Sequence, residues 1–223
     1  MTPRIRRLLF TLGGVAGAIV LVLLGLYLAA QHEPAFYRGA LELDAAAAEK
    51  QSDLMLQRAT ALASAVKKED HWEALFTADQ INGWLAVDMV KNHPKLLPPN
   101  FSDPRVAING TQITIACRCR QAGVNSVLSL TVEPYVPEPN MVLVRIIKAR
   151  AGLLPLPLGD VLDRLSQVAR DMHLHLTWRH AGADPVAVLS FPSADDDRPV
   201  SIETLRLGDG EIYVAGSTQA KKP

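Results

Sequence analysis

The sequence lacks the motifs that identify the commonest classes of enzyme. It contains no G-x-S-x-G, no H-E-x-x-H and no G-x-x-x-x-G-K, which mark serine hydrolases, zinc metalloproteases and phosphate-binding loops. Ser64–Lys67 fits the S-x-x-K of penicillin-binding enzymes, but the S-D-N and K-T-G that accompany it there are missing. Because no pattern pairs a nucleophile with a base, we predict a protein that is not an enzyme and needs no cofactor.

Cysteine is scarce, since the 223 residues include only Cys117 and Cys119. On a strand, residues at this spacing lie about 6.6 Å apart and point the same way, which is unfavourable for a disulfide. They are in phase with Ile113 and Ile115, so we predict two small buried hydrophobic residues. A redox or metal-binding role would require further ligands nearby, and the sequence offers none there.

The histidines and acidic runs do not make a metal motif. His173 and His175 lie on the polar face of a predicted strand, but two imidazoles do not make a closed site. Asp195–Asp197 lies between two prolines and fits a solvated loop, because a cation site would need spaced oxygens and a turn glycine. We therefore predict no metal site.

An excess of basic charge is also missing. The chain has 23 basic and 23 acidic residues, and three of the basic ones, Arg4, Arg6 and Arg7, precede the first acid by many residues. The rest of the chain therefore carries a net charge of −3. A mildly acidic body without a basic stripe argues against binding nucleic acid and against strong general attraction to anionic lipid.

One long apolar run is present, because Leu8–Ala30 has 23 residues without a charge. This length spans a bilayer as a helix, and the basic flank should stay in the cytoplasm. The alternative is a cleaved signal peptide, but those have apolar cores of about 7–15 residues and small residues before the cleavage site. We predict a basic cytoplasmic tail (1–7), a single-pass anchor in the cytoplasmic membrane (8–30) and an extracytoplasmic, periplasmic body.

Gly13 and Gly17 lie four residues apart inside this predicted span. Small residues at that spacing let two helices approach closely, which predicts a homodimer. The alternative is that glycine is simply common in membrane spans.

The next segment, 31–70, is predicted to be a linker and a helical stalk. Leu41–Lys68 is rich in strong helix formers and has no Gly or Pro. Its apolar stripe is weak and relies on alanine, which favours a stalk or a loosely packed helix over a core helix. Thr77 and Gln80 then fit a capping box, which predicts a helix that ends before Pro94.

From Arg105 the apolar period changes to two, which indicates strands. Asn109-Gly110 and Asp209-Gly210 predict hairpins. We expect an α+β domain (71–217) and a flexible tail (218–223). The domain should contain a long, curved antiparallel sheet of about seven strands packed on one or two amphipathic helices.

An unusually apolar stretch, Leu153–Leu158, joins a strand to a helix. Pro155 and Pro157 cannot donate to a strand ladder, so pairing should stop there and the helix should begin at Gly159 or Asp160. We interpret the stretch as the rim of a hydrophobic groove or as the plug that closes it.

Three stretches resemble a class of bacterial envelope proteins, the YpmS-like membrane-anchored and LmeA-like lipid-binding proteins. They are FTADQINGWL, VNSVLSLTVEP and ARAGLLPLPLGDVL, and the likeness extends from Trp72 to Gly216. The resemblance implies a curved antiparallel sheet that wraps a helix, as in tubular lipid-binding folds. It also implies a lipid-handling role for some relatives, and it transfers no catalytic residue.

The function that we expect is that of a membrane-tethered domain that binds lipid or another hydrophobic ligand in the cell envelope. The alternative is a protein-interaction or scaffold module whose core is completely packed. Met141–Val144 is apolar on both faces, and a sheet too wide for one helix to fill would leave a groove for an acyl chain. The predicted groove residues are Val142, Val144, Ile146, Leu153, Leu154, Leu156, Leu158, Leu162 and Leu165.

Overall fold

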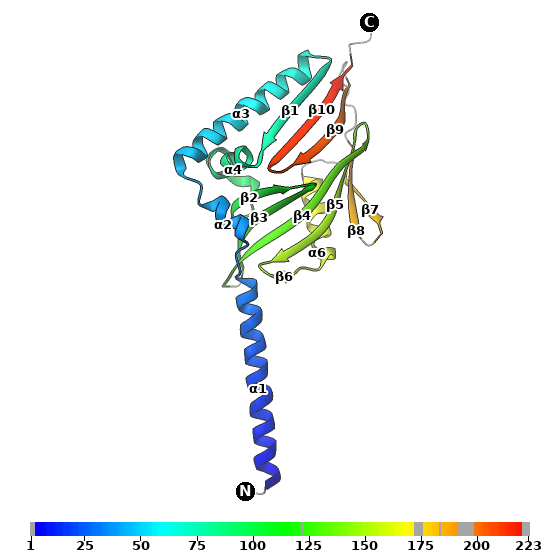
Figure 1. Ribbon diagram of the computed structural model, residues 1–223. Helices are drawn as coiled ribbons and strands as arrows, with labels where there is room; N and C mark the ends of the chain where they lie inside the picture. Colours follow the sequence, from blue (N-terminus) through cyan, green and yellow to red (C-terminus); the bar gives the residue numbers. More distant parts are fainter. Residues whose placement is uncertain (1–2, 122, 172–175, 183, 191–198, 220–223) are drawn as a thin grey trace.

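A computed structural model of the chain describes residues 3–121, 123–171, 176–182, 184–190 and 199–219 (Figure 1). Side chains are described from Gly17 onward, except at positions 168, 171, 181 and 190. The predicted histidine pair His173 and His175 and the acidic run Asp195–Asp197 lie outside these ranges. The helices are α1 (Pro3–Ala30), α2 (Ala35–Leu41), α3 (Ala45–Lys68), α4 (Ala78–Ala86), α5 (Asp88–Asn92), a 3-10 turn η1 (Pro94–Leu96) and α6 (Leu158–Asp171). The strands are β1 (His71–Thr77), β2 (Phe101–Asn109), β3 (Gln112–Gln121), β4 (Val124–Glu138), β5 (Met141–Ala151), β6 (Leu154–Pro155), β7 (Leu176–Ala181), β8 (Asp184–Ser190), β9 (Val200–Gly208) and β10 (Glu211–Thr218).

The described strands form two antiparallel sheets. The large sheet has seven strands in the order β2-β3-β4-β5-β8-β7, with the short β6 paired to β5. The small sheet has the order β1-β10-β9. The α+β class and the seven-stranded antiparallel sheet are confirmed, but the last hairpin pairs with β1 instead of extending the large sheet. Alternation predicts a strand and its faces, whereas it does not specify the strand's partner.

Both predicted hairpin turns are present, and their tips contact each other. Gly110 and Gly210 have φ angles of 55° and 83°, which favour glycine. The Gly110 N–H donates to the Asp209 carboxylate (3.0 Å), and the Gly210 N–H donates to the Ile108 carbonyl (3.0 Å). These bonds join the two sheets at a corner.

Cross-strand partners share a face of a sheet, so the register defines two faces of the large sheet. One face contains the partner row Ile108, Ile113, Val132 and Ile146. We call it the α6 face, because Trp178 lies on it and donates to the Ser166 hydroxyl of α6 at 2.7 Å. The opposite face contains the row Arg105, Ala116, Ser129 and Arg150. We call it the α2 face, because Tyr37 of α2 packs there against Ala116 and Val127.

Helix α4 closes the edge of the large sheet through one side chain. Its capping box forms as predicted, with Thr77 and Gln80 exchanging hydrogen bonds. The buried Asn82 amide then donates to the Val106 carbonyl (2.9 Å) and accepts from the Val106 N–H (2.7 Å). Because β2 is an edge strand, these bonds satisfy backbone groups that would otherwise be open to another chain.

Helix α3 packs along α4 and β1, so of the stalk and the loosely packed helix that the sequence allowed, the structure shows a packed helix. Ala48 and Ser52 of α3 are buried, and Gly83 of α4 lies against them. The alanines that weaken the apolar stripe of α3 are small enough to let the two helix backbones come close. Thr218, which was assigned to the flexible tail, is also buried and donates to the Val66 carbonyl of α3 (2.8 Å).

Helix α1 projects from the domain as one continuous helix (Figure 1). Among the residues with described side chains, no single helix is long and apolar enough to cross a membrane alone. Gly17–Ala30 and Ala35–Leu41, which are bent by 45°, meet that requirement together. The single span over 8–30 therefore stays a prediction from the sequence.

We predict that Gly83→Ala destabilises the domain by about 2–3 kcal/mol, the usual cost of overpacking a rigid contact. A Cβ at Gly83 would lie 2.7 Å from the Ser52 backbone nitrogen and 2.8 Å from the Ala48 carbonyl oxygen. Gly39→Ala is the matched control, because a Cβ there meets nothing within 4 Å, and it should stabilise by about 0.5–1 kcal/mol. Thermal unfolding of both variants tests this, and equal melting temperatures would contradict it.

Candidate functional site

A strip of apolar side chains on β3 and β4 is left open on the α6 face. We call it the apolar strip, and it consists of Ile113, Ile115, Cys117, Leu128 and Leu130. Ile115 is 46% exposed and the other four are partly exposed, whereas Ile108 on one side and Ile146 on the other are 3% and 2% exposed. Helix α4 packs against β2, and α6 packs against β5 and β7. The strip therefore lies on the strands between these two helices.

The strip continues to the base of the domain, where α1 ends. Cys117 pairs with Leu128, and Leu128 pairs with Ala151 at the end of β5. Ala151 in turn pairs with Leu154 of β6. Because these partners share the α6 face, the apolar surface is continuous from Ile115 to the start of the Leu153–Leu158 stretch.

The predicted groove residues are divided among three places. Val142, Val144 and Ile146 lie on the α6 face, but Ile146 is buried beside the strip and does not line an opening. Leu162 and Leu165 are partly buried on α6, while Leu153 is 51% exposed at the base. The remaining predicted residues, all partly buried near the base, are Leu154, Leu156 and Leu158.

Sequence reasoning missed the open part of the face. The alternation of Ile113, Ile115 and Cys117 was correctly assigned to one face, but Cys117 was expected to be buried there and none of these three residues was included in the predicted groove. The two surface cavities that we describe also lie elsewhere. One, of about 460 Å³, is lined by residues 92–96, and the other, of about 400 Å³, lies on the α2 face beside Glu133 and Arg145.

The two cysteines are thiols in apolar surroundings. Cys119 is buried, as predicted, whereas Cys117 is partly exposed on the strip. Burial, and secondly the neighbouring Cys119, raises the pKa of the Cys117 thiol to about 11. The thiol is therefore protonated at neutral pH, which makes it a poor nucleophile and a poor metal ligand.

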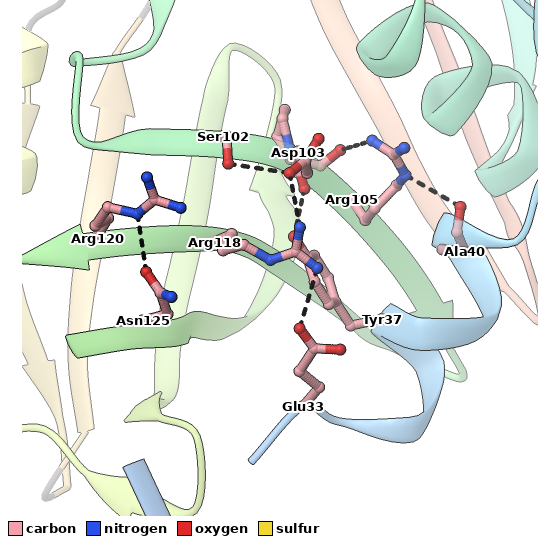
Figure 2. Close-up of polar contacts among 10 residues, drawn as sticks. Glu33, Tyr37, Ala40, Ser102, Asp103, Arg105, Arg118, Arg120 and Asn125 are labelled. Carbon is pink, nitrogen blue, oxygen red and sulfur yellow. Dashed lines mark hydrogen bonds and ion pairs between the residues drawn. The ribbon is translucent and has the colours of Figure 1, made fainter. Parts of the chain in front are cut away.

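A cluster of charged side chains on the α2 face ties the segment after α1 to the large sheet (Figure 2). We call it the polar junction. The Arg118 guanidinium donates to the carboxylates of Glu33 (3.0 Å) and Asp103 (3.2 Å). The Tyr37 hydroxyl donates to the Asp103 carbonyl (2.8 Å), and Arg105 Nε donates to the Ala40 carbonyl (3.0 Å). The sequence analysis did not identify these residues.

The electrostatics of the polar junction fit a structural role. The hydrogen bond to Glu33 raises the pKa of Arg118, and burial lowers the pKa of Arg105 and raises that of Tyr37 to about 12. Tyr37 is fully buried. The hydrogen bond to Glu33 stabilises the charged form of Arg118, and Tyr37 stays protonated near neutral pH, so neither group is poised to transfer a proton there.

The segment after β5 docks on the last residues of α1. Gly152 has a φ of 58°, and a Cβ there would lie 2.3 Å from the Ala29 carbonyl oxygen. The Leu153 N–H donates to the same carbonyl at 2.9 Å. Only glycine allows both the backbone conformation and the close approach at this position.

The strand-to-helix crossover differs from the prediction in two details. Pro155 still pairs with Arg150, so the ladder continues one proline further than expected. Proline is tolerated there because β6 is short and its N–H side is an edge. Helix α6 begins at Leu158 rather than at Gly159 or Asp160, since Pro157 has a φ suited to helix entry.

We predict that Tyr37→Phe lowers stability by about 1 kcal/mol, because the Asp103 carbonyl loses its donor. The raised pKa of Tyr37 also makes the stability of the fold depend on pH. The stabilisation by the protonated hydroxyl is complete below pH 10 and is lost as the pH rises toward 12. The variant should therefore lose less stability over this range than the natural chain, as measured by urea unfolding in a non-ionic detergent. Tyr27→Phe, at an exposed position, is the control. Parallel pH profiles for the natural chain and Tyr37→Phe would contradict the interpretation.

A second prediction concerns Cys117. Since its pKa is raised from 9.0 to about 11, the thiolate fraction at pH 8 is about 100-fold lower than for an unperturbed thiol. In a Cys119→Ala chain the larger cause of the shift, burial, remains, so Cys117 should react roughly 10- to 100-fold more slowly with an aromatic disulfide reagent when folded than when unfolded in urea. Equal rates in the two states would show that Cys117 is an ordinary surface thiol.

Comparisons of the chain with models of protein families, with curated proteins and with solved structures gave no match. The likeness to the YpmS-like and LmeA-like proteins therefore rests on the quoted sequence stretches alone. Function has to be argued from the chemistry of the apolar strip, the polar junction and α1.

Proposed function

We propose that the protein is a membrane-tethered, non-enzymatic component of the cell envelope whose domain binds lipid or another apolar ligand on the apolar strip. The observation that carries this proposal is the exposure of Ile115, at 46%, in the middle of a sheet face whose flanking residues are buried. Leaving such a side chain in water loses about 0.8 kcal/mol for each CH₂ group that could be buried. A bound acyl chain would recover it.

The tether is supported by the composition and exposure of α1. From Ile19 to Leu28 its large apolar side chains are between 45% and 69% exposed, and the sequence from Leu8 to Ala30 has no charge. A helical segment that is apolar on all sides and largely exposed is suited to lipid. The arginines before it favour a cytoplasmic N-terminus and a domain on the outer side of the cytoplasmic membrane.

The position of the apolar strip supports a lipid as the ligand. The strip leads to Leu154 at the base, and the adjoining Leu153 is hydrogen-bonded to the end of α1. An acyl chain that leaves the bilayer beside α1 would reach Leu128 and Ile115 along a continuous apolar surface. Such a path reduces the water contact that makes lipid transfer unfavourable.

The alternative function is that of a protein-interaction or scaffold module. In that case the apolar strip would be covered by another protein, and lipid would contact α1 only. The predicted homodimer through Gly13 and Gly17 fits either function.

We predict that a phospholipid with a photoactivatable acyl chain labels the strip in the full chain reconstituted in vesicles. Mass spectrometry should find cross-links in peptides containing Ile115 and Leu130, as well as in α1, which serves as the internal control. Ile115→Glu places a charge on the strip and should remove the β3 and β4 cross-links while leaving those in α1.

Val90→Glu is the matched control, because Val90 is a 58% exposed aliphatic residue on α5. This variant should keep the cross-links on the strip. Labelling confined to α1 in the natural chain would reject lipid binding by the domain and favour the scaffold function. Absence of labelling in α1 as well would reject the tether.

A further inference from the structure

We propose that Gly152–Pro157, which we call the base loop, inserts into the surface of the membrane that α1 crosses and forms a second attachment of the domain. The base loop contacts the headgroups and the upper acyl region of the outer leaflet. This inference rests on the proposed tether, and it adds a membrane-binding element that fixes how the domain sits on the lipid.

The first observation is the position of the base loop relative to α1. The Leu153 N–H donates to the Ala29 carbonyl at 2.9 Å, and Gly152 packs against the carbonyls of Ala29 and Ala30. These are the last two residues of the uncharged segment. A span over 8–30 ends at the outer lipid boundary, so the hydrogen bond places Leu153 at the same level.

The second observation is the chemistry of the loop. No charged residue occurs from Ala151 to Gly159, although loops at a protein surface are normally polar. Leu153 is 51% exposed, and Pro155 and Pro157 are exposed beside it. Arg150 and Asp160 flank the segment in the sequence, and both are exposed and so open to the charges of a zwitterionic headgroup. This arrangement of an apolar tip between charges suits a lipid–water interface.

The third observation is that the base loop is held in one conformation. Its backbone is fixed by hydrogen bonds from Gly152 N–H to the Val127 carbonyl (2.8 Å) and from Leu156 N–H to the Ala149 carbonyl (2.9 Å). β6 adds a two-residue ladder to β5. An apolar tip that is ordered before it meets lipid loses little conformational entropy on insertion.

The consequence is a fixed orientation of the apolar strip. α1 attaches the domain to the membrane at one point, and a single attachment leaves the domain free to tilt relative to the bilayer. The base loop supplies a second point beside Leu154, where the strip begins (Figure 1 shows β6 near the upper end of α1). With both points engaged, the lower end of the strip faces the lipid.

The test uses the full chain carrying Cys117→Ala and Cys119→Ala, with an environment-sensitive nitrobenzoxadiazole fluorophore on a single introduced cysteine. Leu153→Cys reports on the base loop, Leu23→Cys on α1 and Leu56→Cys on α3. Leu56 is an exposed leucine (39%) on a helix that Figure 1 places away from α1. Each chain is reconstituted in phosphatidylcholine vesicles with and without brominated acyl chains. Because Leu153 is half exposed, its replacement should leave the fold intact, and circular dichroism checks this.

We expect the fluorophores at 153 and 23 to emit at shorter wavelength than the one at 56 and to be quenched by the brominated lipid. If the fluorophore at 153 emits at the wavelength typical of water while the fluorophore at 23 is quenched by lipid, the base-loop inference is overturned and the proposed tether is kept. Emission typical of water at both positions would overturn the tether and the inference together. A short-wavelength emission at 153 without quenching would mean that protein, such as a second copy of the chain, covers the loop, which also overturns it.

Discussion

Two hydrogen bonds between the Asn82 side chain and the backbone of Val106 determine how the helices sit on the large sheet. They hold α4 against the edge strand β2, and Gly83 then lets α3 pack directly on α4. Because α3 and α4 pack at the edge, α6 is the one described helix that packs on the α6 face. It packs against β5 and β7, so the middle of the face, around Ile115, stays open.

The domain is attached to α1 by a small number of contacts near the base of the large sheet. The chain leaves α1 at Ala30 and is at once bound on the α2 face by Glu33 and Tyr37. The base loop meets the last turn of α1 from the end of β5. The partly exposed ion pairs at Arg118 each contribute about 0–1 kcal/mol, so the buried Tyr37 ring and the close contact at Gly152 carry more of the attachment than the charges do.

These features fit one functional picture. An apolar surface that begins beside the end of α1 and continues up the sheet has the form of a short path for an acyl chain. Desolvation raises the pKa of Tyr37 and of Cys117, and both side chains are protonated near neutral pH. Both side chains therefore contribute to packing in their neutral form.

The sequence by itself determined what depends on neighbours along the chain. Period-two alternation identified β3 and its faces, Asn109-Gly110 and Asp209-Gly210 specified turns, and Thr77 with Gln80 specified a helix start, because each is a local constraint on backbone geometry. Only the tertiary structure decided which strand β10 joins, that α3 packs instead of forming a stalk, and that Ile115 is open while Ile146 is buried. These outcomes depend on contacts between residues far apart in the chain, such as Asn82 with Val106 and Leu153 with Ala29, and the side chains involved carry the same local pattern whether or not a distant partner covers them.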